Sequence, residues 1–259
     1  GEICAAIICP GHLVNAGLSG DELVGIANFN QTLDFRLNAR PEIKKPEDLR
    51  GKRIAVSGPG STSHLVSMLA LQGLHIDPTA AKITFLTIPG TEMNRRLALE
   101  SGSVDGTTLR GAMGDLYANK GYPLLYNLKS AGVTLPQNMM VSTRRIAASK
   151  PQVIEGYLKA TIEAIAMIAD PAHKELVCKL LASNLRLNNP ADVEESYQAV
   201  VHNYERAPHT TVEGMKRLQK LMAQLNPKIA EVRVETLLDP SFMNKLESSG
   251  FIQGLYKRN

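Results

Sequence analysis

Between residues 51 and 128, short apolar runs alternate with amphipathic stretches, and this pattern predicts alternating strands and helices. In the stretch 61–72, Leu65, Met68 and Leu69 recur at a helical period. A glycine follows each amphipathic stretch, which is a common helix stop. Strands that are separated by single helices run parallel with right-handed crossovers, so the pattern predicts a small doubly wound α/β sheet. The predicted strands are 54–57, 82–87, 103–109 and 122–128, the predicted helices are 61–72, 91–101 and 112–120, and the stops are Gly73, Gly102 and Gly121.

After about residue 148, one amphipathic stretch follows another. Ser149 is placed to cap the first of these helices. Proline opens several others at the first turn, where its missing N–H costs nothing, after Asp170, Asn189 and Asp239. A further amphipathic helix is predicted over 211–225. The apolar face of the first helix is predicted from a helical period to contain Val153, Tyr157, Leu158, Ile162 and Ile165.

The start of the chain predicts three further strands. The segment "ICAAIICP" is typical of a short strand that enters a turn at Pro10-Gly11, and 22–29 and 33–38 are two more strand candidates. The opening stretch is apolar but lacks the basic residues of a secretion signal, so we do not expect it to be one.

Composition narrows the class of protein. A chain of 259 residues that is 44% apolar is long enough for one large domain or two lobes. The net charge of +4 is mild, basic residues are spread along the chain and aromatics are 5%, so nucleic-acid binding is not expected. No apolar run reaches the roughly 18 residues of a membrane span.

The three cysteines give no metal or redox motif. Cys4, Cys9 and Cys178 are an odd number without a C-x-x-C pair, so at least one is unpaired. Small buried side chains are the favoured interpretation, and a Cys4–Cys9 disulfide is an alternative in an oxidising compartment.

The segment "SGPGSTSH" after the strand 54–57 is a candidate anion cradle. Gly58 and Gly60 allow close approach of the backbone, and Ser61, Thr62 and Ser63 begin a helix whose free N–H groups favour a negative charge. No lysine follows Gly60, so the segment is not a P-loop. The alternative is a serine-capped helix after a tight turn without any ligand.

Four other residues are candidates with structural alternatives. Arg110 ends the strand 103–109 and is the best candidate to pair with an anion, although a surface arginine is equally compatible. His12 follows the expected turn at Pro10-Gly11, where it can touch a ligand or be exposed. His64 lies in the first turn of a helix, so we expect it neutral or solvated. Asp105 is expected to contact backbone amides rather than act as a catalytic acid. No G-x-S-x-G, H-E-x-x-H or Cys/His cluster suggests an enzyme.

Four segments in order resemble one family of bacterial solute-binding proteins. The first, 44–64, resembles "D-L-k-G-K-k-i-a-v-…-G-S"; the others are 95–109, 148–165 and 237–256. They are similar to segments of the sulfonate, taurine, nitrate and thiamine-precursor binding proteins of ABC transporters, the NMT1/THI5-like group. Gly106 stands where this group usually has Ala.

The resemblance implies a fold and a domain organisation. It implies the α/β, two-lobe periplasmic-binding-protein fold (type II), with doubly wound sheets joined by hinge strands. One lobe would comprise 38–139, and the other would be discontinuous, from 1–37 and 140–259. The segment "GEICAAIICP" resembles one that lies well inside such proteins, with Cys4 where Asp is usual, so we expect the family's first strand–helix–strand to be missing from this chain.

The resemblance also implies a function. The protein would capture a small polar, anionic organic ligand between its lobes by hinge closure and deliver it to the membrane permease of an ABC transporter. It would be a periplasmic monomer, either soluble or lipid-anchored, without cofactor, metal or catalytic residues. The implied ligand-binding residues are Ser57, Gly60, Ser61, Thr62, Ser63, Thr108 and Arg110 from one lobe, and His12 and Asn30 from the other.

Two other functions occur on this scaffold. One is an enzyme similar to the pyrimidine-precursor synthases of thiamine biosynthesis, which carry a cysteine-rich iron motif that this sequence lacks. The other is the ligand-sensing domain of a transcription regulator, which requires a helix-turn-helix that the sequence does not show.

Overall fold

The computed structural model describes residues 3–185 and 187–257, which form two compact units. Unit 1 comprises residues 1–31, 135–220 and 227–259, and unit 2 comprises residues 32–134 and 221–226. The chain therefore leaves unit 1 and returns to it twice. The lobe boundaries expected from the sequence, at 38 and 139, stay a prediction.

Unit 2 is built on a five-stranded sheet in the order β5-β4-β6-β3-β7. β4 pairs in parallel with both β5 and β6, as the alternation of strands and helices predicts. β6 and β7 both pair antiparallel with β3, so they run parallel to each other. The strands are β3 (Phe35–Ala39), β4 (Arg53–Val56), β5 (Thr84–Thr87), β6 (Gly106–Arg110) and β7 (Leu124–Asn127), and the helices are η1 (Pro46–Leu49), α2 (Thr62–Gly73), α3 (Glu92–Glu100) and α4 (Gly111–Asn119).

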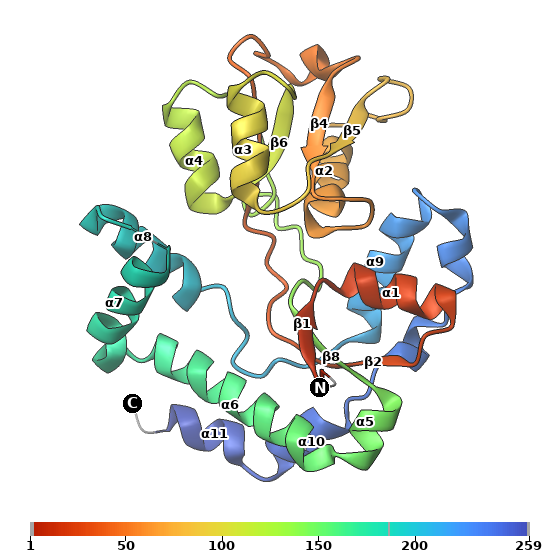
Figure 1. Ribbon diagram of the computed structural model, residues 1–259, viewed down its shortest axis with the longest axis vertical. Coiled ribbons are helices and arrows are strands. Elements are labelled where there is room, and N and C mark those ends of the chain that lie inside the picture. Colours follow the sequence, from red (N-terminus) through yellow and green to blue (C-terminus); the bar gives the residue numbers. More distant parts are fainter. Residues whose placement is uncertain (1–2, 186, 258–259) are drawn as a thin grey trace. The chain divides into compact units, whose positions relative to one another are not determined.

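Helices cover both faces of this sheet (Figure 1). On β6, Thr108 lies against Ser67 of α2, whereas the next residue, Leu109, packs in a cluster with Leu99 of α3 and Tyr117 of α4. Successive strand residues point to opposite faces, so α2 covers one face and α3 and α4 cover the other. The expectation of a doubly wound sheet is confirmed for unit 2.

Helix α2 is buried almost all round rather than on one face. Leu65 and Met68 are buried as predicted, but so are Val66 and Ser67 on other sides of the helix, while Leu69 is only half-buried. A helix that is buried on several sides does not need a polar face, so the amphipathic contrast is weak.

Gly73 ends α2 as predicted, but for a different reason. A Cβ atom on Gly73 would lie 2.1 Å from the Tyr126 hydroxyl oxygen, so only glycine lets the ring pass. The left-handed residue that follows the helix is His75, with a φ of 58°. Gly102 and Gly121, in contrast, have the positive φ of glycine stops, 77° and 90°.

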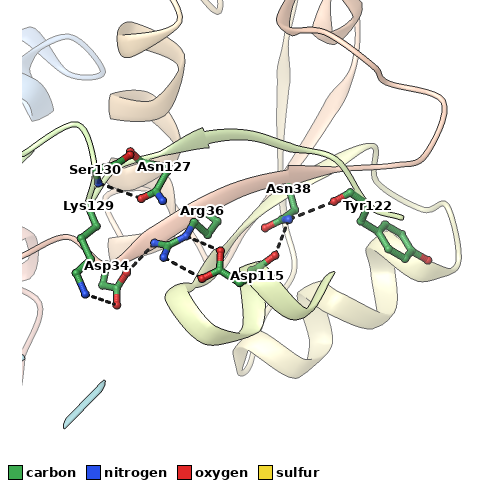
Figure 2. Close-up of polar contacts among 9 residues, drawn as sticks. Asp34, Arg36, Asn38, Asp115, Tyr122, Asn127, Lys129 and Ser130 are labelled. Carbon is green, nitrogen blue, oxygen red and sulfur yellow. Dashed lines mark hydrogen bonds and ion pairs between the residues drawn. The ribbon is translucent and has the colours of Figure 1, made fainter. Parts of the chain in front are cut away.

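Antiparallel β3 is fixed to α4 by a polar network that Figure 2 shows. Arg36 donates from Nε and Nη2 to the two carboxylate oxygens of Asp115, at 2.9 and 3.0 Å, and from Nη1 to Asp34, at 2.7 Å. Asn38 donates to the carbonyl oxygens of Gly114 and Tyr122. Burial opposes the charge of Arg36, but the hydrogen bonds that Arg36 donates to Asp115 and Asp34 outweigh burial and raise the pKa of Arg36.

Asp105, at the start of β6, contacts a backbone amide as expected. Its Oδ2 accepts from the backbone N–H of Arg53 at 2.8 Å and from Arg53 Nε at 2.9 Å. The hydrogen bond from Arg53 is the main reason why the pKa of Asp105 lies below its ordinary value. The pair joins the starts of β4 and β6.

Unit 1 contains a three-stranded sheet in the order β1-β8-β2. β8 pairs antiparallel with both neighbours, so β1 and β2 run parallel to each other and α1 connects them. Each sheet thus holds one antiparallel strand, β8 here and β3 in unit 2, between strands that run parallel. The strands are β1 (Ala6–Ile8), β2 (Leu23–Asn28) and β8 (Met139–Thr143).

Helices α6, α10 and α11 complete the core of unit 1, together with β2 and β8. The described helices are α1 (Pro10–Ser19), α5 (Arg144–Ser149), α6 (Pro151–Ala169), η2 (Pro171–His173), α7 (Lys174–Leu185), α8 (Pro190–Val201), α9 (Val212–Ala223, whose last residues belong to unit 2), η3 (Pro227–Glu231), η4 (Val234–Leu237), α10 (Ser241–Ser248) and α11 (Phe251–Tyr256). Asp170 and Asn189 accept from the N–H two residues ahead, which confirms two of the predicted openings.

One prediction for the long helix α6 is wrong and another is confirmed only in part. Ser149 is the last residue of α5, and Lys150 precedes α6 without a side-chain cap. Of the predicted apolar face, Leu158, Ile162 and Ile165 are buried as expected, but Val153 and Tyr157 are exposed and Ile154 is buried instead. Val153 and Ile154 are adjacent apolar residues, as are Tyr157 and Leu158, so the sequence allows two neighbouring faces and the packing partner selects one of them.

The chain passes from unit 1 to unit 2 at residues 31–32 and back at residues 134–135, and these two segments lie side by side. Thr32 and Thr134 form an isolated antiparallel bridge, and Leu135 N–H donates to the carbonyl oxygen of Gln31 at 3.0 Å. This pairing is what hinge strands require.

The cysteines are half-buried rather than buried, and none of the three is in a disulfide. Among residues 3–185 and 187–257, no helix has both the length and the apolar character to cross a bilayer, and no three His, Cys, Asp or Glu side chains gather as metal ligands.

Candidate functional site: the turn after β4 and the start of α2

The turn after β4 places a ring of small polar groups at the carboxyl end of the strand. Gly60 has a φ of 72°, a left-handed conformation that favours glycine. Ser61 is the N-cap of α2: its Oγ accepts from His64 N–H and donates to the Gly58 carbonyl oxygen at 2.7 Å. The local sequence therefore builds a tight turn directly into a helix.

Ser63 holds this turn together from inside. Its Oγ accepts from Ser57 N–H at 2.8 Å and lies 3.0 Å from Ser57 Oγ and 3.1 Å from Ser61 Oγ. Ser63 is 4% exposed. Three of the predicted binding hydroxyls thus meet, but they also bond to one another, which positions the turn.

The polar groups of this turn that have no partner are mostly backbone N–H donors. Within the described residues, the N–H groups of Gly58, Thr62 and Ser63 and the hydroxyl of Thr62 have no acceptor. N–H groups at a helix N-terminus carry a partial positive charge and favour an anion. The geometry therefore agrees with the predicted anion cradle.

His64 fixes the turn as a neutral side chain. Gly60 N–H donates to His64 Nδ1 at 3.1 Å, so the ring proton is on Nε2. The ring is 7% exposed and its centroid lies 4.7 Å from that of Phe85. Burial lowers the pKa of His64, which confirms the neutral alternative and excludes the solvated one.

Acid is expected to loosen this turn. The pKa of His64 is lowered in the folded protein, so the unfolded chain takes up a proton on this residue first. The stability that neutral His64 contributes is therefore complete above the pKa of the unfolded chain, about 6.5, and is lost as the pH falls below that value. Protonation also places a hydrogen on Nδ1, which ends the bond from Gly60. Unfolding free energy measured from pH 7 to pH 5 should fall less in His64→Asn, which keeps an acceptor but does not titrate. Exposed His12, changed to Asn, is the control; equal pH slopes in all three proteins would contradict the assignment.

Thr108 and Arg110 lie on β6 beside this turn. The register Ala55↔Thr107 places Thr108 level with Val56. Thr108 is 0% exposed, and its hydroxyl lies 3.4 Å from the Ser63 carbonyl oxygen, so it supports the first turn of α2 from below. Arg110 is exposed, with its guanidinium 5.3 Å from the centroid of the Phe35 ring.

The two predicted residues of unit 1 have different environments. Pro10-Gly11 does not form a turn but begins α1, because proline suits the first helical position, so His12 is an exposed helical residue. Asn30 is 0% exposed: its Oδ1 accepts from Asn138 N–H at 3.1 Å and its Nδ2 donates to Asn203 Oδ1 at 3.4 Å. Their binding roles stay predictions.

Sequence reasoning missed Arg95, on α3. It is 6% exposed, and its Nε is buried without an acceptor. The signal that identifies it is its spacing of four residues from buried Leu99, which places both on the inner face of α3.

Comparison with solved structures identifies the class of fold. The alkanesulfonate-binding protein SsuA from Xanthomonas axonopodis pv. citri, bound to MOPS, has a TM-score of 0.69 and 20% identity, over 92% of this chain and 81% of that chain. A Candida albicans protein described as having the generic periplasmic binding protein fold has a TM-score of 0.68 and 16% identity, over 92% and 79%. The desulfurization enzyme DSZB has a TM-score of 0.62 and 15% identity, over 95% and 85%. The chain therefore has the periplasmic-binding-protein fold, as expected.

The family follows from the sequence itself. The family model described as "NMT1/THI5 like" matches residues 1–174, and the chain belongs to this family. No protein with a curated description matches the sequence. The expected resemblance is confirmed.

Proposed function

We propose that this protein is the solute-binding component of an ABC uptake system and binds a small anionic organic solute. The observation that carries the proposal is the set of free N–H groups on Gly58, Thr62 and Ser63 at the start of α2. Thr62 offers the hydroxyl as well. An oxyanion such as a sulfonate satisfies these donors with its several acceptor oxygens.

The comparisons support this proposal at the level of fold and family. SsuA, which shares the fold, is an alkanesulfonate-binding protein. We propose that the two lobes close on the solute about the paired segments at residues 31–32 and 134–135, and that the closed protein docks as a monomer on a membrane permease. The location would be the periplasm, either soluble or lipid-anchored.

A thermal-shift screen tests the proposal. The panel contains alkanesulfonates, nitrate, carboxylates, phosphonates and pyrimidines, and an external dye reports unfolding because the sequence has no Trp. A ligand at about 100 times its Kd adds about 2.7 kcal/mol to the free energy of unfolding. Each kcal/mol raises the Tm by roughly 2–4 °C at this size.

A double variant locates the site. Ser61→Leu with Thr62→Leu removes the cap and covers the free N–H groups, so the ligand-induced shift should disappear. Asn189→Leu is the matched control, because Asn189 caps α8, which like α2 has 12 residues, and its loss should lower the Tm without changing the ligand shift. A full shift in the double variant would show that the ligand binds elsewhere. No shift with any compound, together with turnover of one, would favour an enzyme.

A further inference from the structure

Arg95 is a buried arginine whose charge has no matching carboxylate. No carboxylate oxygen of the described residues lies within ion-pair distance of its guanidinium, and no hydrogen bond from its side chain is formed. Buried Arg36, in contrast, binds two carboxylates. A buried charge without a partner costs free energy, so its retention needs a reason.

The charges around Arg95 leave an excess of one positive charge. Glu92, one turn earlier, favours the charged form of Arg95, and Arg110 opposes it. Glu92 is itself engaged, since its Oε2 accepts from Arg110 N–H at 3.1 Å. Among the groups that act on Arg95, one carboxylate therefore stands against the two guanidinium groups of Arg95 and Arg110, and it forms an ion pair with neither.

This group lies at the same edge of the sheet as the start of α2. Ile88 N–H donates to the Val56 carbonyl oxygen at 2.8 Å, so the segment that leads into α3 runs beside the end of β4. Arg110 ends β6, the neighbour of β4 on the other side. Arg95 occupies the first turn of α3 on its inner face. The carboxyl edge of a parallel sheet is where ligands bind.

We propose that Arg95, assisted by Arg110, is the specificity-determining residue of this site and binds the ionised oxyanion group of the ligand. This inference rests on the proposed function and adds the group that selects a charged ligand over a neutral one. The helix N-terminus supplies partial positive charges from its N–H groups, which also donate to an uncharged oxygen. A guanidinium supplies a full charge and a planar pair of donors that match a sulfonate, carboxylate or phosphonate.

The test compares a charged probe with a neutral one of the same shape. Methanesulfonate, acetate and methylphosphonate are the anionic probes, and methanesulfonamide is the neutral isostere of the first. Calorimetry on the wild type and on Arg95→Gln, Arg95→Lys and Arg96→Gln gives each Kd. Arg96→Gln is the matched control: it removes the same charge from the next residue, whose Nη atoms contact the sulfur atoms of Met113 and Met93.

We expect that only the anionic probes lose affinity, and only when Arg95 is replaced. Arg95→Gln should weaken binding of the anion by about 10-fold or more, the usual size for a charge-assisted hydrogen bond, and leave the sulfonamide within about 2-fold. Arg95→Lys should recover part of the loss, and Arg96→Gln should bind like the wild type. The Tm of ligand-free Arg95→Gln should equal or exceed that of the wild type, because an uncompensated charge is removed.

Three outcomes would overturn the inference. If Arg95→Gln and Arg96→Gln weaken the anion equally, the effect is one of overall charge. If the wild type binds sulfonate and sulfonamide with equal affinity, the proposed function stands and the role of Arg95 fails. If no probe binds the wild type, the inference and the proposed anion site fail together. A cooperative thermal unfolding transition in the wild type and in each variant shows that misfolding is not the cause of lost binding.

Discussion

Replacement of Arg36 by Met is expected to lower the free energy of unfolding by about 2–4 kcal/mol, because it removes one partner of a largely buried ionic network. The Arg36 side chain is 9% exposed, and its guanidinium donates to Asp34, just before β3, and to Asp115, in α4 (Figure 2). Without it, Asp115 loses both hydrogen bonds from Arg36, Asp34 keeps the ion pair with Lys129 at 3.6 Å, and a methionine cannot bond to either carboxylate. The expected loss of stability is smaller than for a fully buried ion pair, because the Asp115 side chain is 47% exposed.

Urea unfolding followed by circular dichroism measures this loss. Arg40→Met is the control, since Arg40 pairs with Glu42 at 2.8 Å but the two side chains are 33% and 54% exposed. Such an exposed pair contributes no more than about 1 kcal/mol. Equal losses in the two variants would mean that the network in Figure 2 does not hold α4 on the sheet.

Gly114→Ala is also expected to destabilise the protein, with a loss of about 1–3 kcal/mol from overpacking. A Cβ atom at this position would lie 2.4 Å from Arg36 Cγ and 2.5 Å from Arg36 Cβ. Because Arg36 Cβ is fixed to strand β3, the neighbour cannot rotate away, and α4 must shift from the sheet. The shift also lengthens the hydrogen bond from Asn38 to the Gly114 carbonyl oxygen, now 2.9 Å.

The opposite sign is expected at Gly156, in α6. A Cβ there meets no atom within 4 Å, so Gly156→Ala keeps the higher helix propensity of alanine and should raise the free energy of unfolding by about 0.5–1 kcal/mol. Urea unfolding of Gly114→Ala and Gly156→Ala, followed by circular dichroism, measures the two opposite changes. A stabilised Gly114→Ala protein would show that α4 has room to move.

The alternation of strands and helices between residues 51 and 128 was readable from the sequence because it depends on neighbours along the chain. Periods of two and of 3.6 residues, and prolines after Asp170 and Asn189, act locally. The turn "SGPGSTSH" was identified for the same reason. Its glycines and serines define its conformation with little help from distant residues, apart from Thr108, which supports it from the neighbouring strand.

Only the tertiary structure decided which of several equivalent local patterns is used. The face of α6 is set by its packing partners, so Ile154 is buried and Val153 is not. Gly73 is required by the ring of Tyr126, which is more than fifty positions away in the sequence. No local rule contains such a contact.

The sequence by itself therefore determined the family, the doubly wound sheet of unit 2 and the serine-capped turn at the start of α2. The tertiary structure decided that β3 and β8 run antiparallel inside their sheets, that the hydroxyls of Ser57, Ser61 and Ser63 bond to one another, and that Arg95 is buried without a carboxylate. The physical reason is the range of the interactions. Helix and strand periods arise between residues a few positions apart, whereas burial and the pairing of charges depend on groups that only the fold brings together.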